Sequence, residues 1–316
     1  MRKLLVFFSM MVIAGFMAVN LTSCGDDPMP LPTVKLLAEV DPDDQYKVNL
    51  TVEATDATTY AWDYGDGNLS VAGENHSHIY AASGDYTIKV TVTNESGTAS
   101  AMANVTINPS IQEMLAGVDA AGKSWVLSKT ISANDGAGPL APSEFNISLP
   151  FALVGDPLEY VGFPAEYDNI FTFKPDGKYA VDNVNGQNLC TQIYAVMTTG
   201  QMEPGDGWTK GQLGFATLSY TSGANPTWKV EEGVTIEMDV MSDDPATPSD
   251  YTPMRVKYEN VTRVSVQNSY FGLLDMSNYV IIENISPDKM QILVLMHTEM
   301  PDVLSIFARL TMVPKS

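Results

Sequence analysis

The sequence predicts an all-β protein made of two consecutive β-domains. Three observations support this. Short segments alternate between apolar and polar residues with a period of two, turn-forming Gly, Pro, Asn and Asp separate them, and no long amphipathic helix pattern follows residue 33. The length of 316 residues suits two domains, and a hydrophobic content of 45% is typical of a globular chain. We expect a small β-sandwich over residues 33–108, a junction over 109–117 and a larger β-domain over 118–316.

The charge balance and the rarity of metal ligands exclude several classes of partner. The chain has 17 Lys and Arg against 38 Asp and Glu, a formal net charge of −21. Nucleic-acid binding needs basic groups that displace counterions from phosphates, so we expect no nucleic-acid partner. Two cysteines and three histidines disfavour a multi-ligand metal site, and no phosphate-binding glycine loop occurs. We therefore predict neither a metal nor a cofactor.

The first 23 residues are typical of a secretion signal. Arg2 and Lys3 precede an almost unbroken apolar run from Leu4 to Val19. At about 1.5 Å per helical residue the run spans roughly 24 Å, short of the ~30 Å hydrocarbon core of a membrane. A signal peptide over residues 1–23 therefore fits better than a permanent anchor.

The residues that follow, Leu21-Thr22-Ser23-Cys24, resemble the lipobox of bacterial lipoproteins. The resemblance implies that Cys24 is acylated with diacylglycerol and becomes the new N-terminus; the alternative is a buried cysteine that follows an apolar stretch. Residues 24–32 are acidic and rich in proline, and they resemble the surface-export signal of lipoproteins from glycan-degrading Gram-negative gut bacteria. A solvated linker is the alternative. We expect a surface-exposed protein, anchored in outer-membrane lipid through Cys24.

The first domain carries two motifs between the alternating segments 46–52 and 86–92. One is the turn that begins with Trp62, and the other begins at His78. Both, at this spacing, closely resemble the PKD (polycystic kidney disease) domain, with its patterns W-D-F/Y-G-D-G and H-x-Y-x-x-x-G-x-Y. The matching residues are Trp62, Asp63, Gly65, Asp66, Gly67, His78, Tyr80, Gly84 and Tyr86. The resemblance implies an immunoglobulin-like sandwich with Trp62 and Tyr86 in its core, and a spacer or interaction role in extracellular proteins.

Two pairs in this domain could be taken for metal ligands. His76 and His78 lie two residues apart, and Asp63 and Asp66 could bind calcium. The family pattern already gives His78 a structural role, and no third ligand is evident. We expect the aspartates to stabilise the turn, because such side chains bond to their own downstream backbone.

The larger domain shows about ten strand patterns with turns between them. They cover residues 123–127, 169–173, 178–181, 214–220, 227–230, 234–240, 262–266, 279–282, 291–296 and 305–313. Pro175-Asp176-Gly177 predicts a hairpin turn. In the junction, Ser110 and Glu113 predict a capping box for a short helix that ends near Gly117. Many strands without a long helix favour a β-sandwich of jelly-roll type, with a lipocalin-like up-and-down barrel as the alternative.

Part of this domain resembles a C-terminal domain that recurs in PKD-containing surface lipoproteins of glycan-uptake loci. The resemblance rests on Trp125, Tyr167, Asp168, Phe171, Phe173, Asp176 and Gly177. It implies glycan binding or adhesion, with other surface glycan-uptake proteins as partners. Members often carry paired tryptophans in the loop before the hairpin, where this chain has Phe145, Phe151, Tyr160 and Phe163 instead.

Sugar binding uses flat aromatic faces together with carboxylates that accept from hydroxyls. The loop candidates are Trp208, Tyr251 and Tyr160 as aromatic contacts, with Asp206 and Asp250 as acceptors. The alternative for Trp208 is a ring packed under its own loop. Trp125 and Trp228 lie in alternating strands and are expected in the core. Cys190 is expected to be an inert thiol.

No complete catalytic constellation is evident. Glu166 and Asp168 begin the E-x-D-x-x-E pattern of one sandwich glycosidase class, but the last carboxylate is missing. Neither a G-x-S-x-G elbow nor an H-E-x-x-H helix occurs. We expect non-catalytic glycan binding rather than an enzyme. A structural adhesin or scaffold subunit is the alternative, and a glycoside hydrolase is less favoured.

Overall fold

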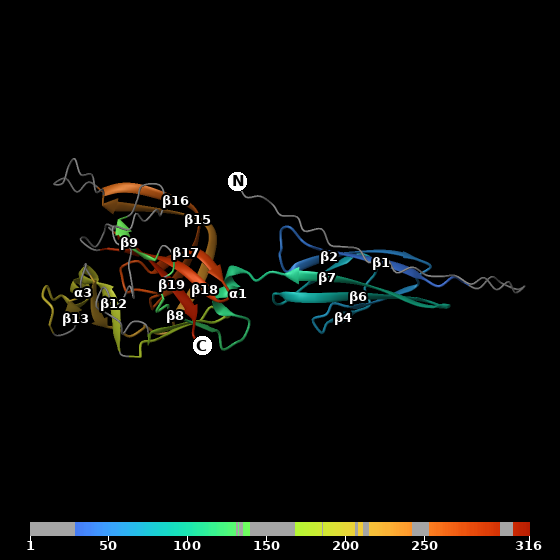
Figure 1. The fold of residues 1–316 in the computed structure, drawn as a ribbon, viewed down its shortest axis with the longest axis horizontal. Coiled ribbons are helices and arrows are strands. Elements are labelled where there is room, and N and C mark those ends of the chain that lie inside the picture. The colour runs from blue at the N-terminus through green and yellow to red at the C-terminus, as the bar shows by residue number, and fades with distance from the viewer. Residues whose placement is uncertain are drawn as a thin grey trace, which may run out of the picture. The chain divides into compact units, whose positions relative to one another are not determined.

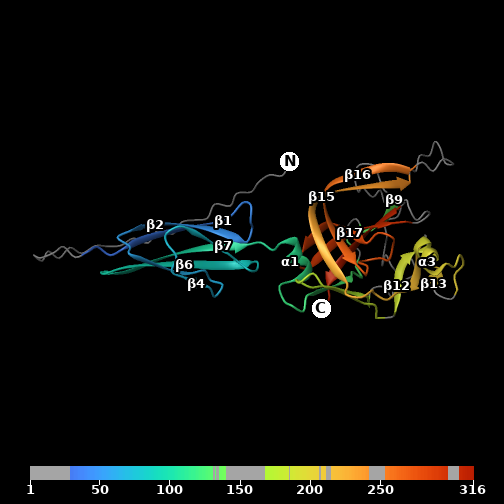
Figure 2. The same ribbon diagram turned by 180° about the vertical axis from the view of Figure 1, so that it is seen from behind.

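The computed structural model describes residues 29–130, 132, 135–139, 168–184, 186–205, 208–210, 215–241, 253–297 and 306–316. The predicted signal peptide and Cys24 lie outside these residues. The chain divides into two compact units, one of Met1–Ala81 with Asp85–Ile107 and the other of Ala82–Gly84 with Asn108–Ser316. Both consist mainly of strands (Figures 1 and 2). Within the described residues, no helix has the length and apolar character that crossing a membrane requires.

The first unit is a sandwich of two antiparallel sheets. Its strands are β1 (Thr33–Val40), β2 (Lys47–Thr55), β3 (Thr59–Asp63), β4 (Leu69–Ser70), β5 (His76–Ile79), β6 (Gly84–Asn94) and β7 (Gly97–Ile107). One sheet has the order β1-β2-β5 and the other β4-β3-β6-β7. The predicted sandwich is confirmed.

Period-two alternation explains how this sandwich buries its core. In β2, Val48, Leu50 and Val52 are buried while the residues between them face solvent, and β6 contributes its alternate residues in the same way. Trp62 is 2% exposed and lies in this core, as expected. Tyr86 is half-buried and packs against the core rather than within it.

The second unit contains two helices and twelve strands in its described part. The helices are α1 (Ile111–Ala116) and α3 (Gln192–Thr199). The strands are β8 (Lys123–Leu127), β9 (Gly136–Pro139), β10 (Ile170–Phe173), β11 (Tyr179–Asp182), β12 (Gln187–Thr191), β13 (Trp208–Lys210), β14 (Phe215–Ser219), β15 (Thr227–Met241), β16 (Pro253–Gln267), β17 (Tyr279–Ser286), β18 (Lys289–Met296) and β19 (Ile306–Pro314).

The main sheet has the order β11-β10-β8-β19-β18-β17-β16-β15, and β9 also pairs with β19. Its end strands meet, because Tyr179 N donates to Pro226 O at 3.0 Å and Trp228 N donates to Gly177 O at 2.9 Å. The sheet therefore curls around on itself. From β15 to β19 each strand pairs with its neighbour along the chain, while β8 lies between β10 and β19, so the strands form a curled, β-sandwich-like sheet. The all-β prediction is confirmed.

Helix α1 closes one end of the curled sheet. Leu115 and Ala116 are fully buried against it, and Trp125 Nε1 donates to Leu115 O at 2.8 Å. Lys123 Nζ donates to Met114 O at 2.8 Å and lies 4.3 Å from the centre of the Trp125 ring. The Ser110 hydroxyl caps the helix by accepting from Glu113 N at 3.1 Å, as the capping pattern predicts.

The β15–β16 hairpin bends and covers the outer face of the sheet. Its register shifts between Glu231 and Ile236. Beyond the bend, Ile236, Met238 and Tyr258 form a second core with residues of β17, β18 and β19. The sequence predicted two separate strands, 227–230 and 234–240, but the structure has one bent strand because the break in alternation is a bulge.

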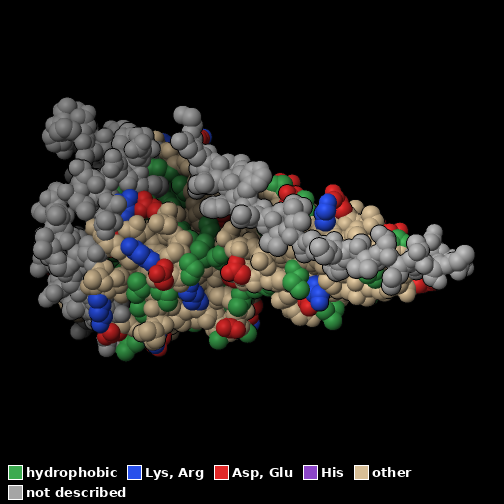
Figure 3. Space-filling model, turned by 45° about the vertical axis from the view of Figure 1, so that its right-hand side comes forward, with side chains coloured by type: hydrophobic (Ala, Val, Ile, Leu, Met, Phe, Trp, Pro, Cys, Tyr) green, Lys and Arg blue, Asp and Glu red, His purple; other side chains and the backbone are tan. Residues whose placement is uncertain are grey.

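Charges of both signs are interspersed on the surface that Figure 3 shows. Exposed ion pairs join neighbouring residues on the hairpins of the second unit, among them Lys178 with Asp176 and Lys257 with Glu259. Such exposed pairs contribute little to stability because water and salt screen them. In each of these pairs a basic side chain lies beside an acidic one, so the two signs of charge are mixed on this surface.

Candidate functional site

Buried polar side chains of the second unit gather at the end of the curled sheet opposite α1. We call this the loop end and define it by Pro139, Thr191, Asp275, His297 and Ile306. Ile306 pairs with both Met296 and Pro139, so β9, β18 and β19 all have a terminus here. The loop between β16 and β17 reaches the same place, since Asp275 contacts Thr191 and His297. The ends of β9 and β12, the β16–β17 loop and the facing ends of β18 and β19 therefore meet at the loop end.

The Asp275 carboxylate is the centre of these contacts, and its side chain is 1% exposed. Its Oδ1 accepts from Thr191 Oγ1 at 3.0 Å. Its Oδ2 accepts from the His297 backbone N at 2.8 Å and lies 2.9 Å from His297 Nδ1. A carboxylate removed from water is tolerated only when hydrogen bonds replace its hydration. These three contacts supply that replacement.

Local structure explains why Thr191 is available to Asp275. Thr191 ends β12 and is the N-cap of α3, where its Oγ1 accepts from Tyr194 N at 3.3 Å. Leu274 N donates to Leu189 O at 2.9 Å, which holds the β16–β17 loop against β12. Asp275 follows Leu274 directly and is thereby placed beside the cap.

A fully buried polar cluster lies where β10, β12 and the β16–β17 loop meet. Asn169 and Asn188 are both 0% exposed. Asn169 Nδ2 donates to Asn188 Oδ1 at 3.3 Å and to the Tyr270 hydroxyl at 3.1 Å. The Tyr270 hydroxyl in turn donates to Asn188 Oδ1. Because these groups bond to one another inside the protein, this cluster is structural.

Cys190 occupies the neighbouring position in β12. It is 0% exposed, and its Sγ donates to Ala216 O at 3.5 Å. The partly buried Tyr194 lies nearby on α3, and burial, followed by the neighbouring Tyr220, raises the pKa of its phenol. The buried position of the thiol agrees with the expectation of an inert cysteine.

The structure describes one of the five predicted sugar-contacting residues. Trp208 begins β13 and is 4% exposed, and its Nε1 donates to Gln201 O at 3.3 Å. In this conformation the ring offers no open face to a sugar, which is the alternative left open above. Tyr160, Asp206, Asp250 and Tyr251 lie outside the described residues, so their role as a sugar site stays a prediction.

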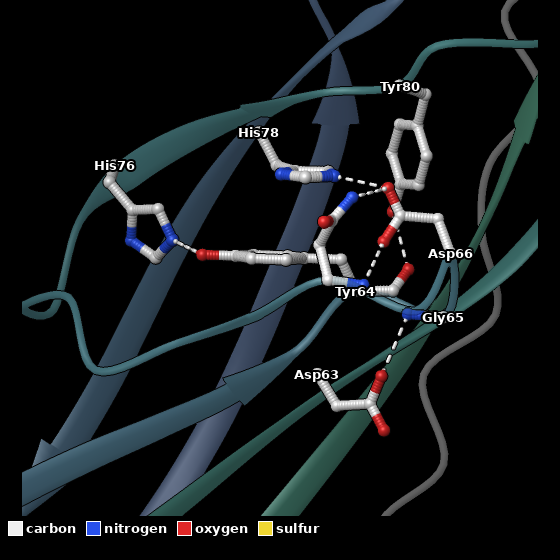
Figure 4. A network of polar contacts seen from close by, with 8 residues as sticks. Asp63, Tyr64, Gly65, Asp66, His76, His78 and Tyr80 are labelled. Carbon is white, nitrogen blue, oxygen red and sulfur yellow. Dashed lines mark hydrogen bonds and ion pairs between the residues drawn. The ribbon is translucent and has the colours of Figure 1, made fainter.

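The motif residues of the first unit form a ladder of rings and carboxylates, shown in Figure 4. His78 Nε2 lies 2.7 Å from Asp66 Oδ2, and its ring stacks on Tyr64 with the ring centres 3.9 Å apart. Tyr64 OH lies 2.7 Å from His76 Nε2. Tyr80 OH donates to Tyr64 O at 2.9 Å. The ladder thus joins β5 to the turn after β3.

The two aspartates of the turn bond to the backbone two residues ahead. Asp63 Oδ1 accepts from Gly65 N at 3.0 Å, and Asp66 Oδ1 accepts from Asn68 N at 3.0 Å. Burial raises the pKa of the Asp66 carboxyl, but the hydrogen bonds from His78 and Asn68 outweigh it and hold that pKa below its ordinary value. Burial lowers the pKa of His76.

The two histidines of β5 have different partners, Tyr64 for His76 and Asp66 for His78, as Figure 4 shows. In the part of the chain that the structure describes, no three His, Cys, Asp or Glu residues are placed to hold a metal ion. The geometry agrees with turn stabilisation, which was expected for Asp63 and Asp66.

Sequence reasoning missed Thr191, Asp275 and His297. Asp275 is 84 residues from Thr191 and 22 from His297, so no local motif joins them. Composition offered the one available signal for His297. The chain has three histidines, and His297 is the one that lies outside the PKD domain.

Residues 29–108 match the family model of the PKD domain. Two solved structures are similar to this part of the chain. The PKD1 domain of Vibrio anguillarum Epp is 24% identical, with 26% of this chain and 98% of that chain covered and a TM-score of 0.23. The PKD1 domain of the Vibrio cholerae metalloprotease PrtV is 21% identical, with 25% of this chain and 96% of that chain covered and a TM-score of 0.21. Residues 29–108 are thus a PKD domain, as their motifs predicted.

A third solved structure aligns with most of the chain. It is a carbohydrate-binding module of the β-sandwich superfamily, described as promiscuous in specificity. It is 13% identical, covers 92% of this chain and 93% of its own, and has a TM-score of 0.25. Among curated proteins, none matches the sequence of this chain.

Proposed function

We propose that the second unit binds an extracellular glycan without cleaving it and that the PKD domain is a spacer. We further propose that acylated Cys24 holds the protein at the outer-membrane surface. Cooperation with other surface glycan-uptake proteins is part of the same proposal.

The observation that carries the glycan proposal is the convergence of strand ends at the loop end. Tyr160 belongs to the segment that leaves β9 at Pro139, and Pro139 pairs with Ile306. Asp250 and Tyr251 lie between β15 and β16. Beyond their bend these strands pack on Leu295 and Phe307, next to Ile306. Segments that leave from neighbouring strands can supply aromatic and acidic groups to one ligand, as loops on a rigid β-scaffold commonly do.

The spacer role of the PKD domain is supported by how its motif residues are used. Asp63 and Asp66 are engaged with backbone of their own turn, and His78 is engaged with Asp66. Trp62 is buried in the sandwich core. These residues stabilise the domain and present no chemistry to a ligand.

One observation favours a second candidate, a scaffold or adhesin subunit. Within the described residues of the second unit, every aromatic side chain is buried or half-buried. A glycan site built on exposed rings would then depend on residues such as Tyr160 and Tyr251. A scaffold would require no exposed aromatic ring.

A non-catalytic role agrees with the missing carboxylate of the glycosidase pattern. Asp168, its second member, is half-exposed and faces Lys129 Nζ at 4.0 Å. Glu166 lies outside the described residues. Hydrolysis would need two carboxylates placed on either side of a glycosidic bond.

The decisive experiment is a screen of the full chain on an array of host mucin and plant cell-wall glycans, followed by calorimetry. We expect modest affinity for at least one glycan and no release of reducing sugar. The PKD domain alone, residues 29–108, should not bind that glycan. Absence of binding across the array would favour the scaffold, and release of reducing sugar would show an enzyme. Tyr160→Ala and Tyr251→Ala, each checked for folding by circular dichroism, identify which aromatic residue contributes.

A further inference from the structure

The segment before β1 lies against the PKD domain and is held there by its backbone. We call residues 29–32 the tether segment. Pro30 O accepts from Asn94 Nδ2 at 2.8 Å, and Met29 O accepts from the Ser96 hydroxyl. The side chains contribute less, because Met29 is 46% exposed and Pro30 is exposed as well. The two hydrogen bonds to backbone carbonyls are therefore the main hold on this part of the chain.

Asn94 joins three parts of this end of the domain, and it is only 6% exposed. Besides Pro30 O, its Nδ2 donates to Asp56 O at 2.8 Å, between β2 and β3. Its Oδ1 accepts from the backbone N of Ser96 at 2.9 Å and of Gly97 at 3.1 Å, in the β6–β7 turn. A buried amide with partners on both its atoms is fixed in place. One side chain thus sets the tether segment against two turns.

The sequence makes the tether segment easy to hold. Proline stands at every second position from 28 to 32. Proline fixes its own φ and disfavours helical backbone in the residue before it, so the segment is extended before it docks and loses little entropy on docking. Proline also has no N–H, so the carbonyl oxygens are the groups left for hydrogen bonding. Asn94 and Ser96 supply donors to two of these carbonyls.

The tether segment and the exit of the chain lie at opposite ends of the PKD domain. Strand β7 begins at Gly97, beside Asn94, and ends at Ile107, where the chain leaves the domain. Figures 1 and 2 show β7 running along the first unit. Its 11 residues rise by about 3.3 Å each, so the two ends are about 33 Å apart.

We propose that Asn94 and Ser96 form a clamp that fixes where the N-terminal chain meets the PKD domain, so that this domain is held from its β6–β7 turn and acts as a spacer along its length. The inference rests on the proposed spacer role and adds the device that orients the spacer. Without the clamp, the chain before Thr33 could approach the domain from many directions.

The clamp also limits how far the PKD domain can stand from its proposed anchor. Four residues, 25–28, separate Cys24 from Met29. A fully extended chain advances at most about 3.6 Å per residue, so the Cα atoms of Cys24 and Met29 are at most about 18 Å apart. With Cys24 acylated as proposed, the clamp therefore keeps the β6–β7 turn close to the membrane.

Double electron–electron resonance can test the clamp in solution, without lipid. We would use the chain of residues 24–316 with Cys24→Ser and nitroxide labels on Met29→Cys and Thr106→Cys, two exposed positions. Cys190 is fully buried and should stay unlabelled. We expect a narrow distance distribution centred near 30 Å, about nine residues along β7. A broad distribution would show a freely moving segment and would overturn the inference.

Two serine variants make a matched comparison. Ser96→Ala removes the hydroxyl that holds Met29 O but keeps the backbone N–H that donates to Asn94. Ser100→Ala removes a second exposed hydroxyl, which lies 3.0 Å from Thr91 Oγ1 and does not contact the tether segment. We expect Ser96→Ala to broaden the distance distribution and Ser100→Ala to leave it unchanged, with both melting temperatures near that of the wild type. Equal widths in the two variants would refute the role of Ser96.

Asn94→Asp tests the second contact of the clamp. Aspartate can still accept from the backbone of the β6–β7 turn, but when ionised it has no N–H to donate to Pro30 O. We expect the broadest distribution and a lower melting temperature, because the carboxylate would be buried beside the carbonyl oxygens of Pro30 and Asp56. A folded Asn94→Asp chain that keeps the narrow distribution contradicts the clamp. If this variant does not fold, the comparison of Ser96→Ala with Ser100→Ala decides.

The outcomes separate the clamp from the function on which it rests. The distances are measured without lipid or glycan, so a broad wild-type distribution overturns the clamp and leaves acylation of Cys24 and glycan binding standing. A Cys24→Ala protein that stays in the membrane fraction overturns the anchor and leaves the clamp standing. A PKD domain that binds the glycan by itself overturns the spacer role, whatever the distances are.

Discussion

Gly233 and Asn260 lie against each other at the bend of the β15–β16 hairpin, and both have left-handed backbone conformations. Their φ angles are +65° and +57°. A Cβ built on Gly233 would lie 3.7 Å from Asn260 Oδ1, which is ordinary contact. The bend lets the far half of the hairpin place Ile236 and Tyr258 over the outer face of the sheet. Two residues that tolerate positive φ therefore allow the second core to form.

Gly233→Ala should destabilise the second unit by about 1–2 kcal/mol, the cost of a left-handed conformation for a residue with a Cβ. The cost is conformational, because the added methyl group meets no clash. Denaturant unfolding of the full chain, followed by tryptophan fluorescence, measures it. Asn260→Gly is the matched control and should be nearly neutral. An unaltered free energy of unfolding in Gly233→Ala would mean that the bend does not depend on this φ.

Trp62→Ala should destabilise the PKD domain by about 3–5 kcal/mol, the range for removal of a large buried aromatic side chain. Trp62→Phe should cost much less. Phenylalanine retains most of the apolar contact, and the Trp62 Nε1 that it removes has no hydrogen-bond partner among the described residues. Thermal unfolding of both variants makes the comparison. If Trp62→Phe destabilised the domain as much as Trp62→Ala, the indole nitrogen would have to make a stabilising contact, which would contradict this account.

The PKD domain should lose stability when the pH falls below about 6.5, the ordinary pKa of histidine. Burial, followed by the neighbouring His78, lowers the pKa of His76 in the folded protein. The unfolded chain then binds the proton first. The contribution of His76 to stability is therefore fully present above its pKa in the unfolded chain. It is lost as the pH falls through its lower pKa in the folded protein.

NMR titration of the ring protons tests this directly, because the chain has three histidines. The midpoint of His76 should lie below its ordinary value. His76→Gln should remove the pH dependence of the melting temperature between about pH 7.5 and 5.5. A His76 midpoint above its ordinary value would contradict the role of burial. Asp66 should act in the same direction at lower pH, because hydrogen bonds from His78 and Asn68 outweigh burial and lower its pKa.

Cys24→Ala should abolish incorporation of labelled palmitate and release the protein from the membrane fraction. The reason is that the thiol of Cys24 is the proposed point of acylation. Shaving of intact cells with protease then tests whether the wild-type protein faces outward. Labelling and fractionation that are the same in Cys24→Ala and wild type would refute the anchor.

The sequence by itself determined those features whose partners lie close along the chain. Asp63 and Asp66 each bond to backbone two residues away, and Ser110 bonds to backbone three residues away. Alternation with a period of two likewise placed Val48, Leu50 and Val52 on one face of β2. Such contacts depend on local geometry, so a short pattern is enough to predict them.

Only the tertiary structure decided how the second unit closes and which residues meet at the loop end. The contact between Gly177, in the turn before β11, and Trp228 of β15 follows from the curl of the whole sheet. The burial of Trp208 depends on β14 and the backbone at Gln201, which come together only on folding. Thr191, Asp275 and His297 are brought together from three separate elements. A buried carboxylate needs partners, but any hydroxyl or imidazole in the chain satisfies that need equally well until packing selects one.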